Sequence, residues 1–128
     1  MYIKLTAQQI KEIHDQELKE SGGLPGIKEP GYLELLADKP FSDYFGQEQY
    51  PGLFCKAAVY FHGIATAHAF SDGNKRTAVL VTYTFLLVNG YELDADPDEL
   101  FEVTIRVATK AMSLQQLEIW LERNSIRA

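Results

Sequence analysis

Two apolar runs of helical length, residues 52–67 and 74–88, constrain the fold of this chain more than any other feature. The first run is apolar around most of its circumference, which is typical of a helix buried on all sides. The second is rich in β-branched residues, but strands rarely reach its length, so we expect another buried helix that stops near Gly90. The sequence therefore predicts a central pair of buried helices joined by a short polar segment.

Shorter amphipathic segments flank this pair and begin with recognisable signals. Thr6 and Ser113 are each followed three residues later by glutamine, which is a capping-box pattern, and Pro97 stands where a helix often begins. The four flanking helices are expected between Thr6 and Gly22 and over 30–37, 97–111 and 113–124. Residues 40–51 predict a loop or flap, and residues 2–5 and 91–93 predict short strands. The fold class is all-α or mainly α, a compact bundle of about six helices.

Length and charge limit what such a bundle can do. The 128 residues, 46% of them apolar, fit a single domain over 1–128 with a self-sufficient core. The formal net charge of -6 argues against direct nucleic-acid binding, because displacing counterions requires positive charge, and against docking on an anionic membrane. Any anion that this protein binds must be held by a local cluster of basic residues.

A cytoplasmic location is expected from three features. Cys55 is the one cysteine, so no internal disulfide can form, and its apolar neighbours predict a buried thiol. The amino-terminal residues show no signal-peptide pattern. The longest apolar stretch, residues 78–88, is far shorter than the ~20 residues that span a bilayer.

The segment that joins the central helices concentrates polar chemistry that a simple connection does not need. Gly73 lets the backbone turn sharply and approach a ligand closely. The helix after it presents free N–H groups and the positive end of its dipole, and Lys75 and Arg76 add two cations at the same turn. Cations oppose the dipole there, so this pattern predicts that an anion such as a phosphate binds at the turn.

His68 and Asp72 supply the remaining reactive groups. An imidazole titrates near neutral pH, so His68 is a candidate general base or acid. Asp72 offers a hard oxygen ligand for Mg²⁺, the ion that accompanies nucleotide phosphates. Each also has a plainer role, His68 as the polar end of an apolar helix and Asp72 as the cap of the next helix. The functional interpretation depends on their occurrence together with the glycine and the cations.

The order of these residues resembles the motif of the Doc ("death on curing") toxins, a branch of the Fic fold. The matching segment reads His68-Ala69-Phe70-Ser71-Asp72-Gly73-Asn74-Lys75-Arg76-Thr77. Flanking matches at residues 14–15, 22–26, 63–65, 85–86 and 89–90 extend the resemblance over roughly residues 5 to 122. Broader Fic proteins have glycine at Lys75 and a second arginine near Val79, and they mostly transfer AMP. The resemblance therefore favours the kinase branch.

The Doc resemblance implies a toxin that uses ATP and Mg²⁺ to phosphorylate a threonine of a translation elongation factor Tu, which arrests protein synthesis. It implies that Asn74 and backbone amides hold phosphate oxygens, that Asp72 positions the metal, and that Lys75 and Arg76 neutralise the transferred group. His68 would take the proton from the threonine hydroxyl. The implied partner is a Phd-like antitoxin whose helix docks in an apolar groove, expected near 97–111, 113–124 and 32–36.

Several alternatives remain open. AMP transfer is the competing reaction, and a non-catalytic antitoxin-binding module is the competing class. Many family members have arginine at the position of Thr66, so a phosphate or target contact is missing here. A zinc site at His62, His68 and Asp72 is disfavoured, because Lys75 and Arg76 would repel the metal. Two structural roles are also expected, Phe70 as a core anchor and His14 as a partner of Asp15.

Overall fold

The two central helices form the most extensive helix–helix contact of the structure. They are α3 (Leu53–Ala67) and α4 (Asn74–Val88), at the positions that the apolar runs predict. The computed structural model describes residues 1–23, 26–27, 30–67, 70 and 73–128. Phe61, Val81 and Phe85 are completely buried between the layers, so the pair forms the centre of the core.

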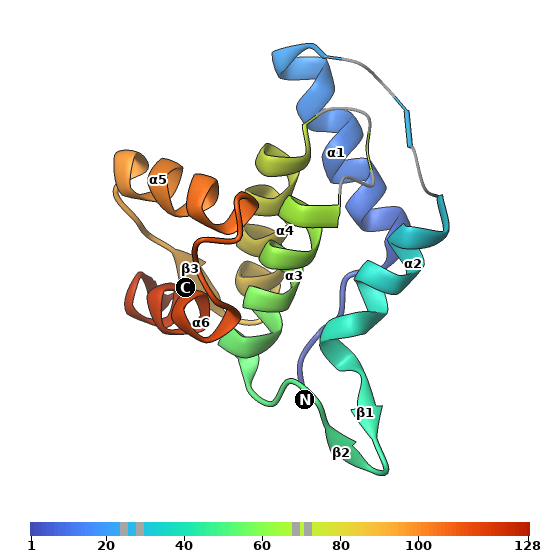
Figure 1. Cartoon of the computed structure of the whole chain (residues 1–128), viewed down its shortest axis with the longest axis vertical. Coiled ribbons are helices and arrows are strands. Elements are labelled where there is room, and N and C mark those ends of the chain that lie inside the picture. Colours follow the sequence, from blue (N-terminus) through green and yellow to red (C-terminus); the bar gives the residue numbers. More distant parts are fainter. Residues whose placement is uncertain (24–25, 28–29, 68–69, 71–72) are drawn as a thin grey trace.

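The other helices cover this pair from two sides (Figure 1). α1 (Ala7–Ser21) packs on α4, and α2 (Pro30–Asp38) packs on α1 and α3. On the opposite side α5 (Pro97–Ala108) and α6 (Leu114–Arg123) pack against α3. The described residues thus form six α-helices and two small strand pairs, which confirms a mainly α fold with a buried central pair.

Local signals set the helix starts as the sequence predicts. Both capping boxes are formed: the side chain of Thr6 accepts from the amide of Gln9, and that of Ser113 accepts from the amide of Gln116, each at 3.1 Å. Pro97 is the first residue of α5, whose cap is Asp96. Such caps satisfy amides that have no acceptor within the helix, which is why they fix where a helix begins.

The strands differ in part from expectation. β3 (Tyr91–Leu93) is confirmed, and it pairs antiparallel with β4 (Ser125–Arg127), which the sequence did not indicate. The strand expected over residues 2–5 is wrong. That segment is held instead by the side chain of Asn89, which accepts from the amide of Ile3 at 2.6 Å and donates to its carbonyl at 3.0 Å.

The expected loop or flap is a short β-hairpin. A 3-10 turn, η1 (Lys39–Phe41), leads into β1 (Asp43–Tyr44), which pairs with β2 (Gln47–Glu48). The hairpin projects from the helical body in Figure 1. Its base is fastened to α3 by Lys56, a fully buried lysine whose Nζ donates to the carbonyl of Tyr50 at 2.5 Å and lies 3.2 Å from a carboxylate oxygen of Glu48.

Two smaller expectations also need correction. Cys55 is half-buried rather than fully buried, and burial is the main cause that raises the pKa of its thiol above the ordinary value. The helix expected to reach Ala111 ends at Ala108, and Ala111 is exposed. None of the helices among the described residues has both the length and the apolar character needed to cross a membrane.

α5 ends in a turn that places a lysine in an unusual conformation. The amide of Lys110 donates to Val107 at 3.0 Å and that of Ala111 to Arg106 at 2.7 Å, which is the paired pattern of a Schellman motif. This motif requires a left-handed residue, usually glycine, and here Lys110 has a φ of 63°. The β-carbon of a lysine is strained there, so its side chain is retained at some cost in stability.

We therefore expect Lys110→Gly to stabilise the fold by about 0.5–1 kcal/mol, because relief of the left-handed strain exceeds the entropy cost of the glycine. Urea unfolding of both proteins measures the difference. Thr109→Gly is the matched control, since Thr109 has a φ of -91° and gains nothing from glycine. If Lys110→Gly loses as much stability as Thr109→Gly, the backbone of Lys110 is not strained.

Candidate functional site

Phe70 anchors the turn that carries the motif. Its side chain is fully buried, and its ring stacks on the imidazole of His14 with centroids 3.7 Å apart and planes 7° from parallel. Its backbone forms an isolated antiparallel bridge with Ile27. The expected core role of Phe70 is confirmed. His14 Nδ1 also lies 3.4 Å from Asp15 Oδ1, so the predicted contact is present at a long hydrogen-bond distance.

Asn74 closes the turn with two hydrogen bonds to one residue. Its Nδ2 donates to the carbonyl of Phe70 at 3.0 Å, and its Oδ1 accepts from the amide of Phe70 at 3.1 Å. The side chain predicted to hold phosphate oxygens is therefore engaged in fixing the loop between the two central helices. What Asn74 presents to a ligand in this arrangement is its backbone amide at the first turn of α4.

Gly73 begins α4 in a left-handed conformation. Its φ is 77° and its ψ 16°, a region that glycine enters without strain. Gly73, and not Asp72, is the cap residue, so the expected capping role of Asp72 is wrong. The first intrahelical bond joins the amide of Thr77 to the carbonyl of Gly73 at 2.9 Å. The amides of residues 74–76 precede it, and a helix has no internal acceptor for such amides.

The two cations of this turn have different surroundings. Both side chains are exposed, and among the described residues no carboxylate pairs with Lys75. Arg76 Nε lies 2.8 Å from Glu17 Oε1, and the Glu17 side chain is only 13% exposed. This contact is made by the Nε edge of the guanidinium, whose planar group carries five N–H donors in all.

α1 supports the turn through one face. His14 stacks on Phe70, Glu17 pairs with Arg76, and Leu18 and His14 lie closest to where a side chain of Gly73 would begin. The three supporting residues share a face because they are spaced by three and four positions along a helix. Sequence reasoning did not find Glu17 or Leu18 in this role, although the spacing from His14 was a usable signal.

His68 and Asp72, the predicted base and the predicted metal ligand, lie outside the described residues, so their geometry stays a prediction. Among the described residues no cluster of three or more histidine, cysteine or acidic side chains could hold a metal ion. Of the predicted site residues, the structure therefore brings Gly73, Asn74, Lys75 and Arg76 together at one helix start.

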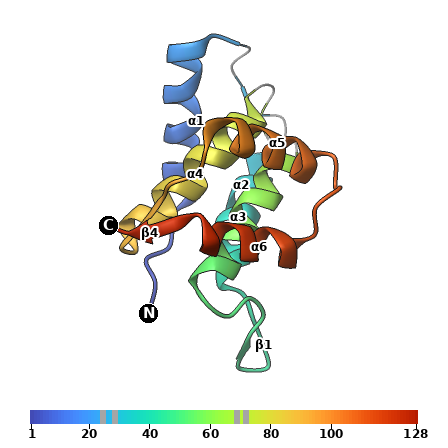
Figure 2. The same cartoon turned by 90° about the vertical axis from the view of Figure 1, so that its left-hand side faces the viewer.

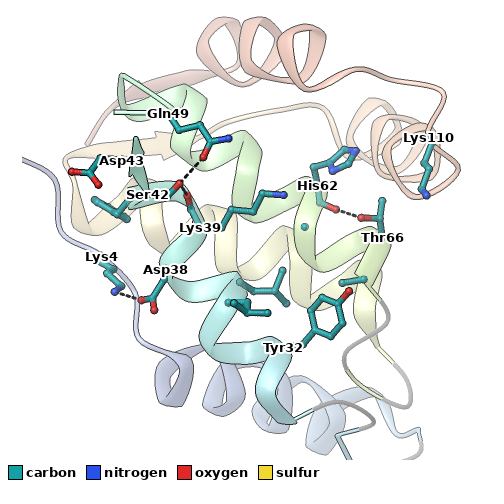
Figure 3. A pocket seen from close by; sticks show the side chains of 15 residues that line it. Lys4, Tyr32, Asp38, Lys39, Ser42, Asp43, Gln49, His62, Thr66 and Lys110 are labelled. Carbon is teal, nitrogen blue, oxygen red and sulfur yellow. Dashed lines mark hydrogen bonds and ion pairs between the residues drawn. The ribbon is translucent and has the colours of Figure 1, made fainter. Parts of the chain in front are cut away.

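A large open cleft lies beside the carboxyl end of α3 (Figure 3). Its volume is about 950 Å³, and Thr66 and Ala67, the last residues of α3, form part of its wall. The Thr66 hydroxyl donates to the carbonyl of His62 at 2.7 Å, so it is turned back onto its own helix. Burial, and then the charges of Lys39 and Lys110, lower the pKa of His62 below its ordinary value.

Comparison with known proteins agrees with this architecture. The fold and the motif turn define a mainly α protein of Fic type, and the model of the Fic/DOC family matches residues 4–86. Toxin Doc of Mycolicibacterium smegmatis is 36% identical over 98 residues, which are 75% of each chain. Protein kinase doc of Escherichia phage P1 is 31% identical over 119 residues, 93% of each chain. The chain belongs to the Fic/Doc family, in the Doc branch that the sequence motif indicated.

The Glu17–Arg76 pair should be energetically asymmetric. Arg76→Met removes the cationic partner of a largely buried carboxylate and leaves it only the hydroxyl of Ser21 as a donor, at an expected loss of about 1–2 kcal/mol in the free energy of unfolding. Glu17→Gln leaves a hydrated guanidinium and an amide oxygen that can still accept a hydrogen bond. The free energy of unfolding should therefore fall by less than about 1 kcal/mol in this variant. Urea unfolding of both variants measures the two losses.

The double variant Glu17→Gln/Arg76→Met completes the cycle and should be more stable than Arg76→Met alone. Lys75→Met is the matched control, because Lys75 lies at the same turn and has no carboxylate partner among the described residues. Equal losses for the two single variants would show that the pair does not fix Arg76.

Proposed function

We propose that this protein is a toxin that phosphorylates a protein hydroxyl with ATP. The observation that carries the proposal is the first turn of α4, where three backbone amides and the side chains of Lys75 and Arg76 meet next to the motif loop. Such a turn suits the phosphates of a nucleotide. The relative in Escherichia phage P1, which matches 93% of this chain, is named a protein kinase.

In this proposal each residue of the motif has a defined task. The amides of α4 and the cations Lys75 and Arg76 hold the phosphates and neutralise the charge on the transferred group. His68 takes the proton of the acceptor hydroxyl. The hydroxyl oxygen then bonds to the γ-phosphorus of ATP, and the bond between that phosphorus and the bridging oxygen of ADP breaks. Asp72 would hold Mg²⁺, which screens the charge of the phosphates.

The acceptor is a threonine of a translation elongation factor of the Tu type, as the Doc resemblance implies. Modification of that factor would arrest protein synthesis, and it places the proposed action in the cytoplasm. The competing reaction, AMP transfer, is less favoured because this chain has lysine at position 75 and valine at position 79, where broader Fic proteins have glycine and arginine.

The reaction is tested with purified protein, bacterial elongation factor and ATP labelled at either the α- or the γ-phosphate. We expect label on the factor from γ-labelled ATP only, and His68→Ala should lower the rate by about 10²–10⁴-fold, because the general base is lost. Lys19→Gln is a control that removes an exposed lysine of α1 that is not part of the motif. Label from α-labelled ATP would instead establish AMP transfer.

The His68→Ala variant also distinguishes a catalytic toxin from a toxin that acts only by binding. If His68→Ala still arrests bacterial growth as well as the unchanged protein, the toxin acts by binding alone, and the catalytic proposal is wrong.

We also propose that a Phd-like antitoxin docks as a helix in the groove between α4 and α5. The groove holds about 530 Å³, and Figure 2 shows α5 beside the amino-terminal half of α4. Its walls are largely apolar, and Phe101 in it is 68% exposed. Lys75, Arg76 and Glu17 line the same groove, so an occupant would reach the motif. α5 belongs to the region expected from the sequence, whereas the opposite wall is α4.

Phe101→Asp should weaken binding of the antitoxin encoded beside this gene by at least about tenfold, because an exposed aromatic anchor is replaced by a charge. Isothermal titration calorimetry with the purified antitoxin measures this change. Ile119→Asp is the matched control, since Ile119 on α6 is 45% exposed and lies outside the groove. A stronger effect of Ile119→Asp would move the docking site to α6.

A further inference from the structure

One half of the cleft beside α3 is lined by nitrogen-bearing side chains from three separate segments. Lys39 comes from η1, His62 from α3 and Lys110 from the turn after α5, and Figure 3 shows them grouped near Thr66. The two lysines are close enough to His62 to lower the pKa of its imidazole. Among the described residues no carboxylate lies within 4.0 Å of either lysine.

The rest of the cleft has a different charge. Lys4 forms an ion pair with Asp38, and Asp43 lies near that pair, away from His62 and Thr66 (Figure 3). The cleft is therefore polarised, with its cationic half next to the end of α3, where the motif loop begins. This clustering is notable in a chain that has 12 basic and 18 acidic residues, since most of its cations could find a carboxylate.

Lys110 provides an independent indication. It occupies a left-handed position with a φ of 63°, where glycine is the ordinary residue and a lysine is strained. Residues in strained backbone conformations cluster at functional sites, where the side chain has a role. The side chain that is retained there lines the cationic half of the cleft.

The shape and surroundings of the cleft select among anions. The carboxyl end of α3 lies on this side, and its partial negative charge opposes any anion, most strongly one of high charge density such as a compact polyphosphate. The two lysines come from separate elements and stand around about 950 Å³ of open space, rather than in one tight turn, and His62 adds a ring nitrogen from a third element. This arrangement suits an extended chain that carries several carboxylates.

We propose that Lys39, His62 and Lys110 form a docking site for an acidic segment of the protein substrate, which would bring the acceptor hydroxyl toward the adjacent motif. This inference rests on the proposed kinase function for its biological meaning, but the binding itself does not require catalysis. The site also supplies cations near the position where Thr66 replaces the arginine of many family members.

Binding is tested by NMR titration of the full chain with an acetylated hexaglutamate peptide at low salt, without nucleotide. We expect shifts at residues of the cleft, and the double variant Lys39→Gln/Lys110→Gly should bind about fivefold to tenfold more weakly. Lys19→Gln, which removes an exposed cation from α1, should bind like the unchanged protein. A hexaglutamine peptide should cause no shifts.

Three results would overturn the proposal: equal peptide affinity of the double variant, shifts that centre on Lys75 and Arg76, or displacement of the peptide by ATP. Since glycine suits position 110, an unfolded variant is not expected, and a thermal melt verifies this.

Transfer kinetics then separate this inference from the proposed function. The double variant should raise KM for the protein substrate and leave kcat and KM for ATP unchanged. If the unchanged protein transfers no phosphate, the proposed function fails while the peptide titration still decides the docking site. If phosphate is transferred and the double variant has an unchanged KM for the protein substrate, only the docking site fails.

Discussion

The stacking of Phe70 on His14 is the contact on which the candidate site depends. It joins the connection between the two central helices to α1, a helix far away in the sequence, and it buries both rings completely or nearly so. The two hydrogen bonds between Asn74 and the Phe70 backbone then fix the start of α4 relative to that anchor. A phosphate-binding turn must be rigid before its ligand arrives, because electrostatic stabilisation is strongest when the donors need not reorganise.

This anchoring changes the meaning of the motif residues. Phe70 and Asn74 act on the loop itself, whereas Lys75 and Arg76 face outward from it. Glu17 holds Arg76 from α1, so the charge of that arginine is partly balanced before any ligand binds. A motif that looks uniform in sequence is thus divided into residues that build the turn and residues that can meet a phosphate.

The groove between α4 and α5 and the cleft beside α3 have different linings. The groove between α4 and α5 is mostly apolar and ends at Lys75 and Arg76, which suits an amphipathic helix. The cleft beside α3 is open and of mixed polarity, with Lys39 and Lys110 in the half nearest the end of α3, which suits an acidic chain. In our proposals a regulator and a substrate therefore approach the same turn from different faces.

The sequence by itself determined the helices, because capping boxes, prolines and apolar periodicity are local properties of the chain. Thr6, Pro97 and Ser113 mark helix starts correctly, and the family follows from a contiguous motif. The β4 strand, the side-chain support of residues 2–5 by Asn89 and the true cap of α4 were not predictable in the same way. Only the tertiary structure decided the partners of Arg76 and the grouping of Lys39, His62 and Lys110, since these residues meet through helix packing that no local pattern encodes.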